Sequence, residues 1–322
     1  MKCLLQPQTN NQQNMDAIVA EKITKQFKET VALKEVSFQV RAHELFGFIG
    51  PDGAGKTTLF RLIASLMLPN SGSLKVLGLD PVTEFKALRK KLGYMPGRFS
   101  LYQDLTVEEN LDFYATIFGT TIEENYDLIK DIYSHIEPFK TRPAGKLSGG
   151  MKQKLALSCA LIHKPELLIL DEPTTGVDAV SRKEFWQMLK NLQKQGITVV
   201  VSTPYMDEAA LCDRVALIQK GSLLSVDTPE NIINSFKTEL YGLRSVDMYN
   251  LLIQLKAYAF CENAHLFGQY IHASFKGELN RNDLLNYLKT KGIEDVEITG
   301  IKPGIEDCFM QLMVSNETLE TV

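Results

Sequence analysis

Apolar and polar positions alternate in short runs over the first quarter of the chain, which is typical of strands joined by turns. Strands are predicted near residues 17–23, 31–40, 44–49 and 74–77. A helix-like run follows the third of these strands and ends near Met67. Strands and helices that follow each other in this way predict an α/β fold.

Residues from about 84 to 160 carry mostly helical patterns. Thr106-Val107-Glu108-Glu109 reads as a capping box that starts an amphipathic helix through Phe118. Further on, the apolar run Leu167-Leu168-Ile169-Leu170 ends in two carboxylates, Asp171 and Glu172. This run predicts a buried parallel strand whose C-terminal edge faces a site.

The pattern changes after Pro229. Apolar stretches bracket a helix-like segment, and a further helix, strand and helix follow, at 239–246, 247–255, 257–275, 284–288, 293–301 and 305–314. This β-α-β-β-α-β order predicts a small α+β ferredoxin-like sandwich.

The composition along the chain predicts three parts. Residues 1–15 are polar and aperiodic, without the apolar core of a signal peptide, and are expected to form a flexible extension. Residues 16–230 form the α/β unit, with a helical subdomain at about 84–160, and residues 231–322 form an accessory domain. No stretch approaches eighteen consecutive apolar residues, so the chain itself is not expected to span a bilayer.

A glycine-rich loop joins the strand at 44–49 to the next helix, and it reads Gly50-Pro51-Asp52-Gly53-Ala54-Gly55-Lys56-Thr57-Thr58. Its glycines allow backbone N–H groups to close around phosphate oxygens. Lys56 supplies a positive charge to the outer phosphates, and Thr57 offers a hydroxyl to Mg²⁺. The loop therefore predicts binding of a nucleoside triphosphate with Mg²⁺. The alternative is a tight strand-to-helix turn that happens to be rich in glycine.

The two carboxylates after the apolar run at 167–170 fit the same chemistry. Asp171 is predicted to reach Mg²⁺ through water, and Glu172 to polarise the attacking water as a general base. The alternative for Glu172 is a solvated carboxylate at a strand end.

A third motif lies between the loop and the carboxylates, and it reads Leu147-Ser148-Gly149-Gly150-Met151-Lys152-Gln153. Locally, Ser148 is a helix N-cap followed by Gly149 and Gly150, so the amides of the first turn point toward an anion. Together the three motifs resemble the ATP-binding cassette (ABC) family, whose signature motif reads LSGGQ. The resemblance covers roughly residues 16–230.

The resemblance implies a P-loop NTPase fold, with a RecA-like core, an antiparallel β subdomain and a helical subdomain. In that family two cassettes face each other head to tail, and the signature of one caps the ATP held by the other. Phe27 matches the aromatic residue that stacks on adenine; the alternative is a core residue beside a strand. Asp178 matches the aspartate that bridges the two cassettes, and it also reads as a helix N-cap.

Two positions depart from the family pattern. Gly97 stands where the family has a glutamine that contacts Mg²⁺ or the lytic water, and Pro204 where it has a histidine that touches the γ-phosphate. Neither residue has a side-chain hydrogen-bond donor. These losses predict an asymmetric dimer with a second, hydrolysing cassette, in which this chain holds ATP and lends its signature. The competing prediction is a symmetric homodimer in which Glu172 suffices.

The resemblance also implies transmembrane permease subunits as partners and a peripheral position on the cytoplasmic face of the plasma membrane. A coupling helix of the permease is expected to dock beside Gly97, against exposed residues of the segment 98–102, although simple loop packing would also explain that segment. The ending at 302–310 resembles that of exporter cassettes. The predicted function is therefore the ATPase subunit of an exporter. The alternatives are a soluble ABC ATPase and a regulatory subunit that mainly binds ATP.

Charge and composition exclude other classes of function. The net charge of −4 gives no electrostatic case for nucleic acid as the main partner. The five cysteines are scattered and predict reduced thiols with no zinc site; they are Cys3, Cys159, Cys212, Cys261 and Cys308. The five histidines are isolated in the sequence and are expected to be structural or solvated; they are His43, His135, His163, His265 and His272.

Overall fold

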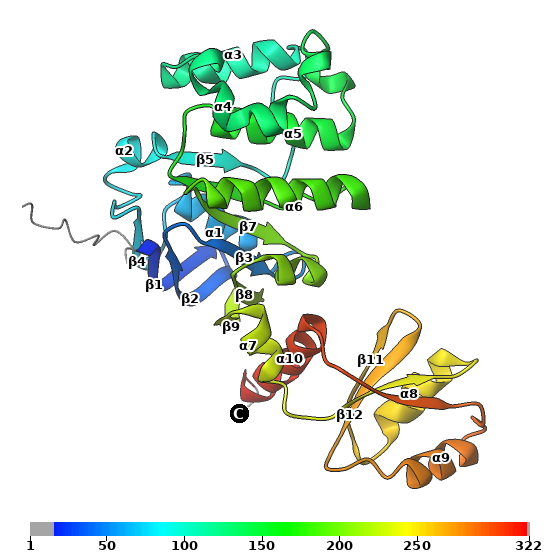
Figure 1. Cartoon of the computed structure of the whole chain (residues 1–322). Helices are drawn as coiled ribbons and strands as arrows, with labels where there is room; N and C mark the ends of the chain where they lie inside the picture. Colours follow the sequence, from blue (N-terminus) through cyan, green and yellow to red (C-terminus); the bar gives the residue numbers. More distant parts are fainter. Residues whose placement is uncertain (1–15, 321–322) are drawn as a thin grey trace, which may run out of the picture. The chain divides into compact units, whose positions relative to one another are not determined.

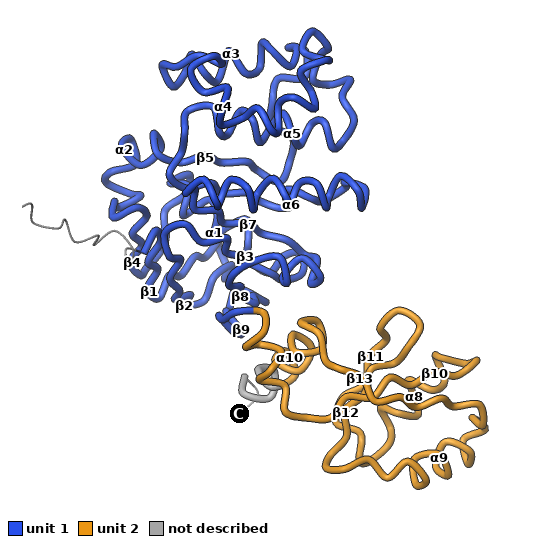
Figure 2. The backbone as a smooth tube through the Cα atoms, viewed as in Figure 1, with its two compact units in different colours: residues 1–228 blue, residues 229–322 orange. Residues whose placement is uncertain are grey.

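The computed structural model describes residues 16–320, with side chains for residues 16–314. The chain divides into two compact units, residues 1–228 and 229–322 (Figure 2). The second unit begins at Pro229, two residues before the start at residue 231 that the sequence predicts. The predicted N-terminal extension, residues 1–15, lies outside the described residues. No helix within residues 16–320 is both long and apolar enough to cross a membrane.

A three-stranded antiparallel sheet opens the first unit. Strand β1 (Asp16–Phe27) lies between β2 (Thr30–Arg41) and β4 (Ser71–Val76). Buried apolar side chains alternate with exposed ones along the second half of β2, as expected of a sheet with one face on the core. The strands predicted in this region are present, and β1 extends four residues beyond its predicted end.

A six-stranded sheet forms the centre of the first unit, in the order β5-β6-β7-β3-β8-β9. Its strands are β3 (Leu45–Ile49), β5 (Leu92–Met95), β6 (Leu167–Asp171), β7 (Thr198–Thr203), β8 (Arg214–Gln219) and β9 (Ser222–Asp227). The strands from β5 to β8 run parallel, and β9 pairs antiparallel at the edge. Every residue of β3, β6 and β7 is buried, which explains their continuous apolar runs.

Helices cover the central sheet and form a separate group beside it (Figure 1). They are α1 (Lys56–Ile63), α2 (Phe85–Arg89), α3 (Val107–Phe118), α4 (Ile122–Tyr133), α5 (Gly149–Leu161) and α6 (Ala179–Lys194), with short 3₁₀ helices η1 (Glu137–Phe139), η2 (Ala144–Lys146) and η3 (Met206–Leu211). Helices α3, α4 and α5 contact one another and form the helical group.

The predicted helix boundaries are correct at α3 and wrong at α1. The capping box of α3 is present, since Thr106 accepts from the amide of Glu109 and the Glu109 carboxylate accepts from the amide of Thr106. Helix α1 ends at Ile63, before the predicted end at Met67. Ser65 adopts the left-handed conformation, with φ of 56°, and this ends the helix.

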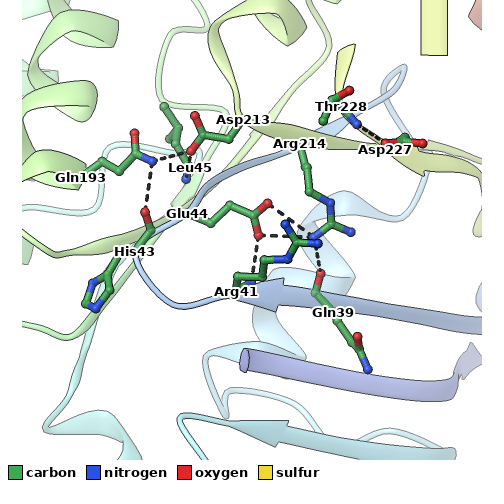
Figure 3. Close-up of polar contacts among 10 residues, drawn as sticks. All are labelled: Gln39, Arg41, His43, Glu44, Leu45, Gln193, Asp213, Arg214, Asp227 and Thr228. Atoms are coloured by element: carbon green, nitrogen blue, oxygen red, sulfur yellow. Dashed lines mark hydrogen bonds and ion pairs between the residues drawn. The ribbon is translucent and has the colours of Figure 1, made fainter. Parts of the chain in front are cut away.

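A polar network fixes the beginning of β3 (Figure 3). The buried carboxylate of Glu44 lies 3.4 Å from the guanidinium of Arg214. The Asp213 carboxylate accepts from the amide of Leu45 at 2.9 Å and from the side chain of Gln193. Because buried polar groups are costly without partners, this network holds β3 in register at the end opposite the glycine-rich loop.

The second unit has the β-α-β-β-α-β order that the sequence predicts. Its elements are α7 (Pro229–Asn234), β10 (Leu240–Arg244), α8 (Met248–Ala257), β11 (Cys261–Phe267), β12 (Tyr270–Phe275), α9 (Arg281–Thr290), β13 (Glu297–Ile301) and α10 (Ile305–Glu320). The strand order in the sheet is β11-β12-β10-β13, all antiparallel. Apolar residues of α8 and α9 pack on one face of this sheet. The last strand begins at Glu297, later than the predicted 293.

Two predictions about cysteine and histidine have different outcomes. Free thiols are present at the described cysteines, which are Cys159, Cys212, Cys261 and Cys308, and Cys3 lies outside the described residues. The histidines are isolated in the sequence, but the fold brings His265 and His272 together. These two face each other across the β11–β12 hairpin, because antiparallel register pairs them directly.

Candidate functional site

The glycine-rich loop follows β3 and leads into α1, and close contacts demand glycine at two of its positions. A Cβ atom at Gly50 would lie 2.1 Å from the carbonyl oxygen of Ile218. At Gly55 a Cβ atom would lie 2.6 Å from the carbonyl oxygen of Ala32, and φ there is +106°, which disfavours other residues. The neighbouring backbone therefore fixes the shape of the loop.

The first turn of α1 suits an anion. Its N-cap is Gly55, which supplies no side-chain hydrogen bond to the free amides at the start of the helix. Amides at a helix N-terminus bind phosphate through their N–H groups and the positive end of the helix dipole. The backbone geometry of the loop is therefore suited to bind the phosphate groups of a nucleotide.

The Lys56 ammonium lies beside the carboxylate that follows β6. It is buried, donates to the carbonyl oxygens of Gly50 at 2.7 Å and Pro51 at 3.0 Å, and lies 3.2 Å from Oε1 of Glu172. The structure therefore brings together two of the sequence-predicted site residues, one on α1 and one after β6.

Asp171 and Glu172 are held by the neighbouring strand β7. The hydroxyl of Ser202 donates to Oδ1 of the buried Asp171 at 2.7 Å. The amide of Glu172 donates to both the hydroxyl and the carbonyl oxygen of Ser202. Glu172 has a left-handed φ of 50°, a strained conformation for a residue with a side chain, and such strain is common at functional sites. Sequence reasoning did not identify Ser202.

A cavity of about 410 Å³ opens at the loop. Its lining consists of Thr30, Val31, Ala32, Lys34, Gly53, Ala54, Gly55, Lys56, Thr57, Thr58, Glu172, Lys220 and Gly221. Gly221 was missed by sequence reasoning. Its amide donates to the carbonyl oxygen of Ala54 at 3.0 Å, and its carbonyl oxygen accepts from the amide of Lys34 at 2.8 Å. Gly221 therefore braces the loop. Lys220-Gly221, between two strand-like runs, is the turn signal that could have identified it.

The signature turn lies at the start of α5, and the predicted N-cap is present. Ser148 accepts from the amide of Met151 at 3.3 Å. Ser148 and Gly149 are exposed, and a Cβ atom at Gly150 would lie 3.1 Å from the hydroxyl oxygen of Ser181 on α6. Among the described residues, the turn contributes nothing to the lining of the cavity at the loop.

Two other predicted site residues are exposed and lie outside that lining. Asp178 caps α6 by accepting from the amides of Val180 at 3.1 Å and Ser181 at 3.0 Å, as the N-cap prediction requires. The hydrogen bond from the amide of Ser181 is the main reason that the pKa of Asp178 is below its usual range. Phe27 is 44% exposed at the end of β1, so its ring is accessible.

The two positions that depart from the family pattern lie near Asp171. A Cβ atom at Gly97 would lie 3.0 Å from the carbonyl oxygen of Asp171, so a larger residue there requires the backbone to shift. Pro204 follows the last residue of β7 and is half-buried. Both positions therefore follow the C-terminal ends of parallel strands, at the same edge of the sheet as Glu172.

The segment after Gly97 differs from its prediction at two residues, because Phe99 is half-buried and Leu101 is buried. Leu101 is 7% exposed and therefore belongs to the core, so the prediction that it is exposed is wrong. Arg98, Ser100 and Tyr102 are exposed, as predicted. An apolar cavity of about 240 Å³ lies beside them, with Tyr94, Phe99, Leu101, Tyr114 and Phe118 among its lining residues. Leu101 is buried because its side chain forms part of the wall of this cavity.

Comparison with known proteins agrees with this site. Residues 33–175 match the ABC transporter family. The chain is 37% identical over 294 residues to the probable multidrug ABC transporter ATP-binding protein YbhF of Escherichia coli K12, with 90% of this chain and 50% of that protein covered. It is 34% identical over 238 residues to the Nod factor export ATP-binding protein I of Rhizobium etli, with 73% of this chain and 74% of that protein covered. This chain spans about half the length of YbhF.

A solved structure has the same fold. The dimeric ATP-binding cassette MJ0796, in a post-hydrolysis state with ADP and phosphate, matches with a TM-score of 0.60 and 26% identity, over 66% of this chain and 98% of that one. Fold, loop and carboxylates define a P-loop nucleotide-binding protein. With the relatives above, they show that this chain belongs to the ABC transporter family and carries its ATP-binding cassette.

Proposed function

We propose that the chain is the ATPase subunit of an ABC exporter and energises separate transmembrane permease subunits. One observation carries this proposal: the exposed signature turn at Ser148 lies outside the chain's own cavity at Lys56. An exposed turn of this kind is available to a nucleotide that a second cassette holds. The printed names of the relatives, which refer to multidrug transport and to Nod factor export, support export as the direction.

Within this proposal the loop at 50–58 holds the phosphates of ATP. The Thr57 hydroxyl and, through water, the Asp171 carboxylate hold Mg²⁺, which neutralises charge on the phosphates when bound. Glu172 accepts a proton from the attacking water. The ion pair between Lys56 and Glu172, at 3.2 Å, supports this assignment because it places both groups at one cavity.

We further propose that the cassette dimer is asymmetric, with a different chain as partner. Gly97 and Pro204 leave the site around Glu172 without two side-chain donors, whereas the signature at 148–150 keeps the family pattern. Loss of one preorganised donor to a charged transition state commonly costs about a hundredfold in rate. This chain then holds ATP mainly as a clamp, and its signature serves the partner's faster site.

The proposed location is the cytoplasmic face of the plasma membrane, through the permease. The apolar cavity beside Phe99, with Arg98 and Tyr102 exposed next to it, is the proposed docking place for the permease's coupling helix. ATP binds the closed dimer better than the open one, and hydrolysis removes that preference. This difference drives the permease.

The test is to purify the chain alone, with the product of a neighbouring cassette gene, and with neighbouring multi-span proteins, and to measure ATP retention and phosphate release. We expect the chain alone to retain ATP and release phosphate slowly, and the complex to turn over faster. Fast release by the chain alone would favour a symmetric homodimer. ATP retention without phosphate release in every mixture would favour a regulatory subunit. Association with ribosomes instead of permeases would favour a soluble ABC ATPase.

A further inference from the structure

Two histidines share one face of the hairpin in the second unit. His265 on β11 pairs directly with His272 on β12, and their ring centroids lie 6.0 Å apart. Their strand neighbours Ala264 and Ile271 belong to the core under α8 and α9. Because successive side chains alternate between faces, both imidazoles lie on the face opposite that core.

Asp307 on α10 supplies a carboxylate to the same place. Its Oδ1 lies 2.7 Å from Nδ1 of His272 and 3.4 Å from Nε2 of His265, and its side chain is 3% exposed. Its Oδ2 accepts from the amide of Gly304 at 2.8 Å, just before the helix begins. That bond orients the carboxylate, so Oδ1 is held toward the two rings.

We propose that His265, His272 and Asp307 form a binding site for a divalent transition-metal ion, with Zn²⁺ as the ion that the donor set fits. The three donor atoms all lie within 4.8 Å of one another. Two imidazole nitrogens and one carboxylate oxygen are three ligands of a tetrahedral zinc site, and water takes the fourth position. Donors around such an ion lie about 3.3 Å apart, since the bonds are about 2.0 Å.

The hydrogen bonding of the cluster supports an ion. Nε2 of His265 is buried and makes no hydrogen bond, and its 3.4 Å contact with Oδ1 of Asp307 is an ion pair only when the imidazole is protonated. A simple ion pair between Asp307 and His272 would account for the shorter contact and still leave the nitrogen of His265 unsatisfied. Buried polar atoms without a partner are rare, and a coordinated ion would satisfy this one.

The cluster is also accessible from outside. A pocket of about 270 Å³ is lined by His265 together with Glu262 and by Met310 of α10, among others. Such a pocket gives an ion a route to His265 from solvent, which a metal site requires. The ion would tie the hairpin to α10. The inference does not depend on the proposed function, because none of these residues lines the cavity at Lys56.

The test uses the full chain after removal of metals with a chelator that is then dialysed away. Zn²⁺ is titrated without nucleotide by calorimetry, and Co²⁺ is added to a second sample for visible spectroscopy. We expect one equivalent of Zn²⁺ to bind and Co²⁺ to give the d–d bands of a site with nitrogen and oxygen ligands. Mg²⁺ is not expected to bind there, since it prefers oxygen ligands.

Three variants locate the site: His265→Gln, His272→Gln and Asp307→Asn. Each is expected to weaken Zn²⁺ binding at least about tenfold to a hundredfold. Asn at 307 keeps an oxygen for the amide of Gly304, so the helix start is preserved. His135→Gln, at an exposed histidine of the first unit, is the matched control and should bind like the wild type.

The proposal remains testable if a variant misfolds. Circular dichroism identifies such a variant, and the Co²⁺ spectrum of the unaltered chain then reports the ligands without any substitution. The absence of a stoichiometric Zn²⁺ site in the unaltered chain would overturn the proposal. Zn²⁺ binding of equal strength in the folded His265→Gln variant and in His135→Gln would also overturn it.

Discussion

The phosphate loop and the signature turn are two glycine-rich helix starts on the same cassette, and they differ in what surrounds them. Helix α1 begins at Gly55 without a side-chain cap, at a cavity that also holds Glu172. Helix α5 begins with Ser148 as a side-chain cap, on the surface. The first therefore lies at a cavity of this chain, whereas the second is open to contact from another molecule.

Glycine has different surroundings in the phosphate loop and in the signature turn. Glycine at positions 50 and 55 is required by carbonyl oxygens that approach within 2.6 Å of where a Cβ atom would lie. In the signature turn, Gly149 has only an ordinary contact, at 3.5 Å, and a Cβ atom at Gly150 would lie 3.1 Å from the hydroxyl oxygen of Ser181. Backbone atoms therefore exclude a side chain at these two loop positions, whereas the turn is packed less tightly and its first glycine is exposed. In the proposed asymmetric dimer, Gly97 and Pro204 weaken the first region alone, and the following variants test that division.

The largest effect is expected for Ser148→Asp. Aspartate keeps the N-cap of α5 but presents a negative charge where the partner's γ-phosphate is proposed to lie. Phosphate release by the mixed dimer should fall about a hundredfold or more, while ATP binding to this chain alone stays the same. The control is Thr106→Asp at the cap of α3, which should leave release intact. Equal losses in both variants would contradict a role for the signature.

Lys56→Ala should have the next largest effect, on the other region. Hydrogen bonds to charged groups contribute about 1.5–3 kcal/mol, so ATP affinity should fall roughly tenfold to a hundredfold. Titration with a fluorescent ATP analogue measures this. Lys154→Ala is the control. Lys154 is also largely buried and forms an ion pair with Glu184 at 2.9 Å, but it does not line the cavity at the loop. Unchanged affinity in Lys56→Ala would refute the assignment of the loop.

Pro204→His is expected to raise activity. It restores one side-chain donor beside the ends of β6 and β7, so phosphate release by the chain alone should rise about tenfold. Gly97→Gln should gain less, because its Cβ atom would lie 3.0 Å from the carbonyl oxygen of Asp171. Steady-state phosphate release measures both. If Pro204→His gives no gain and the fold is intact, the missing histidine does not limit this site.

The smallest effect concerns Asp178, which caps α6. Because the amides of Ser181 and Val180 lower the pKa of Asp178, the ionised carboxylate adds stability that is present above its ordinary pKa and lost as pH falls through the folded-state pKa. The difference in Tm between the wild type and Asp178→Asn should therefore be small and positive at pH 7, begin to shrink below about pH 4, and vanish only once the pH has fallen below the lowered folded-state pKa of Asp178. A difference that persists at low pH would show that the charge contributes nothing.

Local motifs made much of the cassette predictable from sequence. The phosphate loop, the strand that ends in Asp171 and the caps at Thr106, Ser148 and Asp178 each depend on neighbours within a few residues. The β-α-β-β-α-β order of the second unit was also legible, because its apolar runs are separated by clear breaks.

Tertiary contacts explain what the sequence did not reveal. Ser202 orients Asp171 from a strand 31 residues away, and Gly221 braces Ala54 from a distant hairpin. The approach of His265 and His272 depends on strand register, and Asp307 joins them from a helix 35 residues after His272. Such contacts depend on how distant segments pair, and one sequence without its fold contains no local pattern for them.

The most direct measurement compares two glutamate-to-glutamine changes in the mixed dimer. Glu172→Gln alters this chain's site, and the matching change alters the partner's. The account predicts that phosphate release and transport fall by a small fraction in the first case and at least about a hundredfold in the second, because the partner's site turns over faster. Equal losses from the two changes, with both proteins folded and retaining ATP, would contradict the asymmetric dimer.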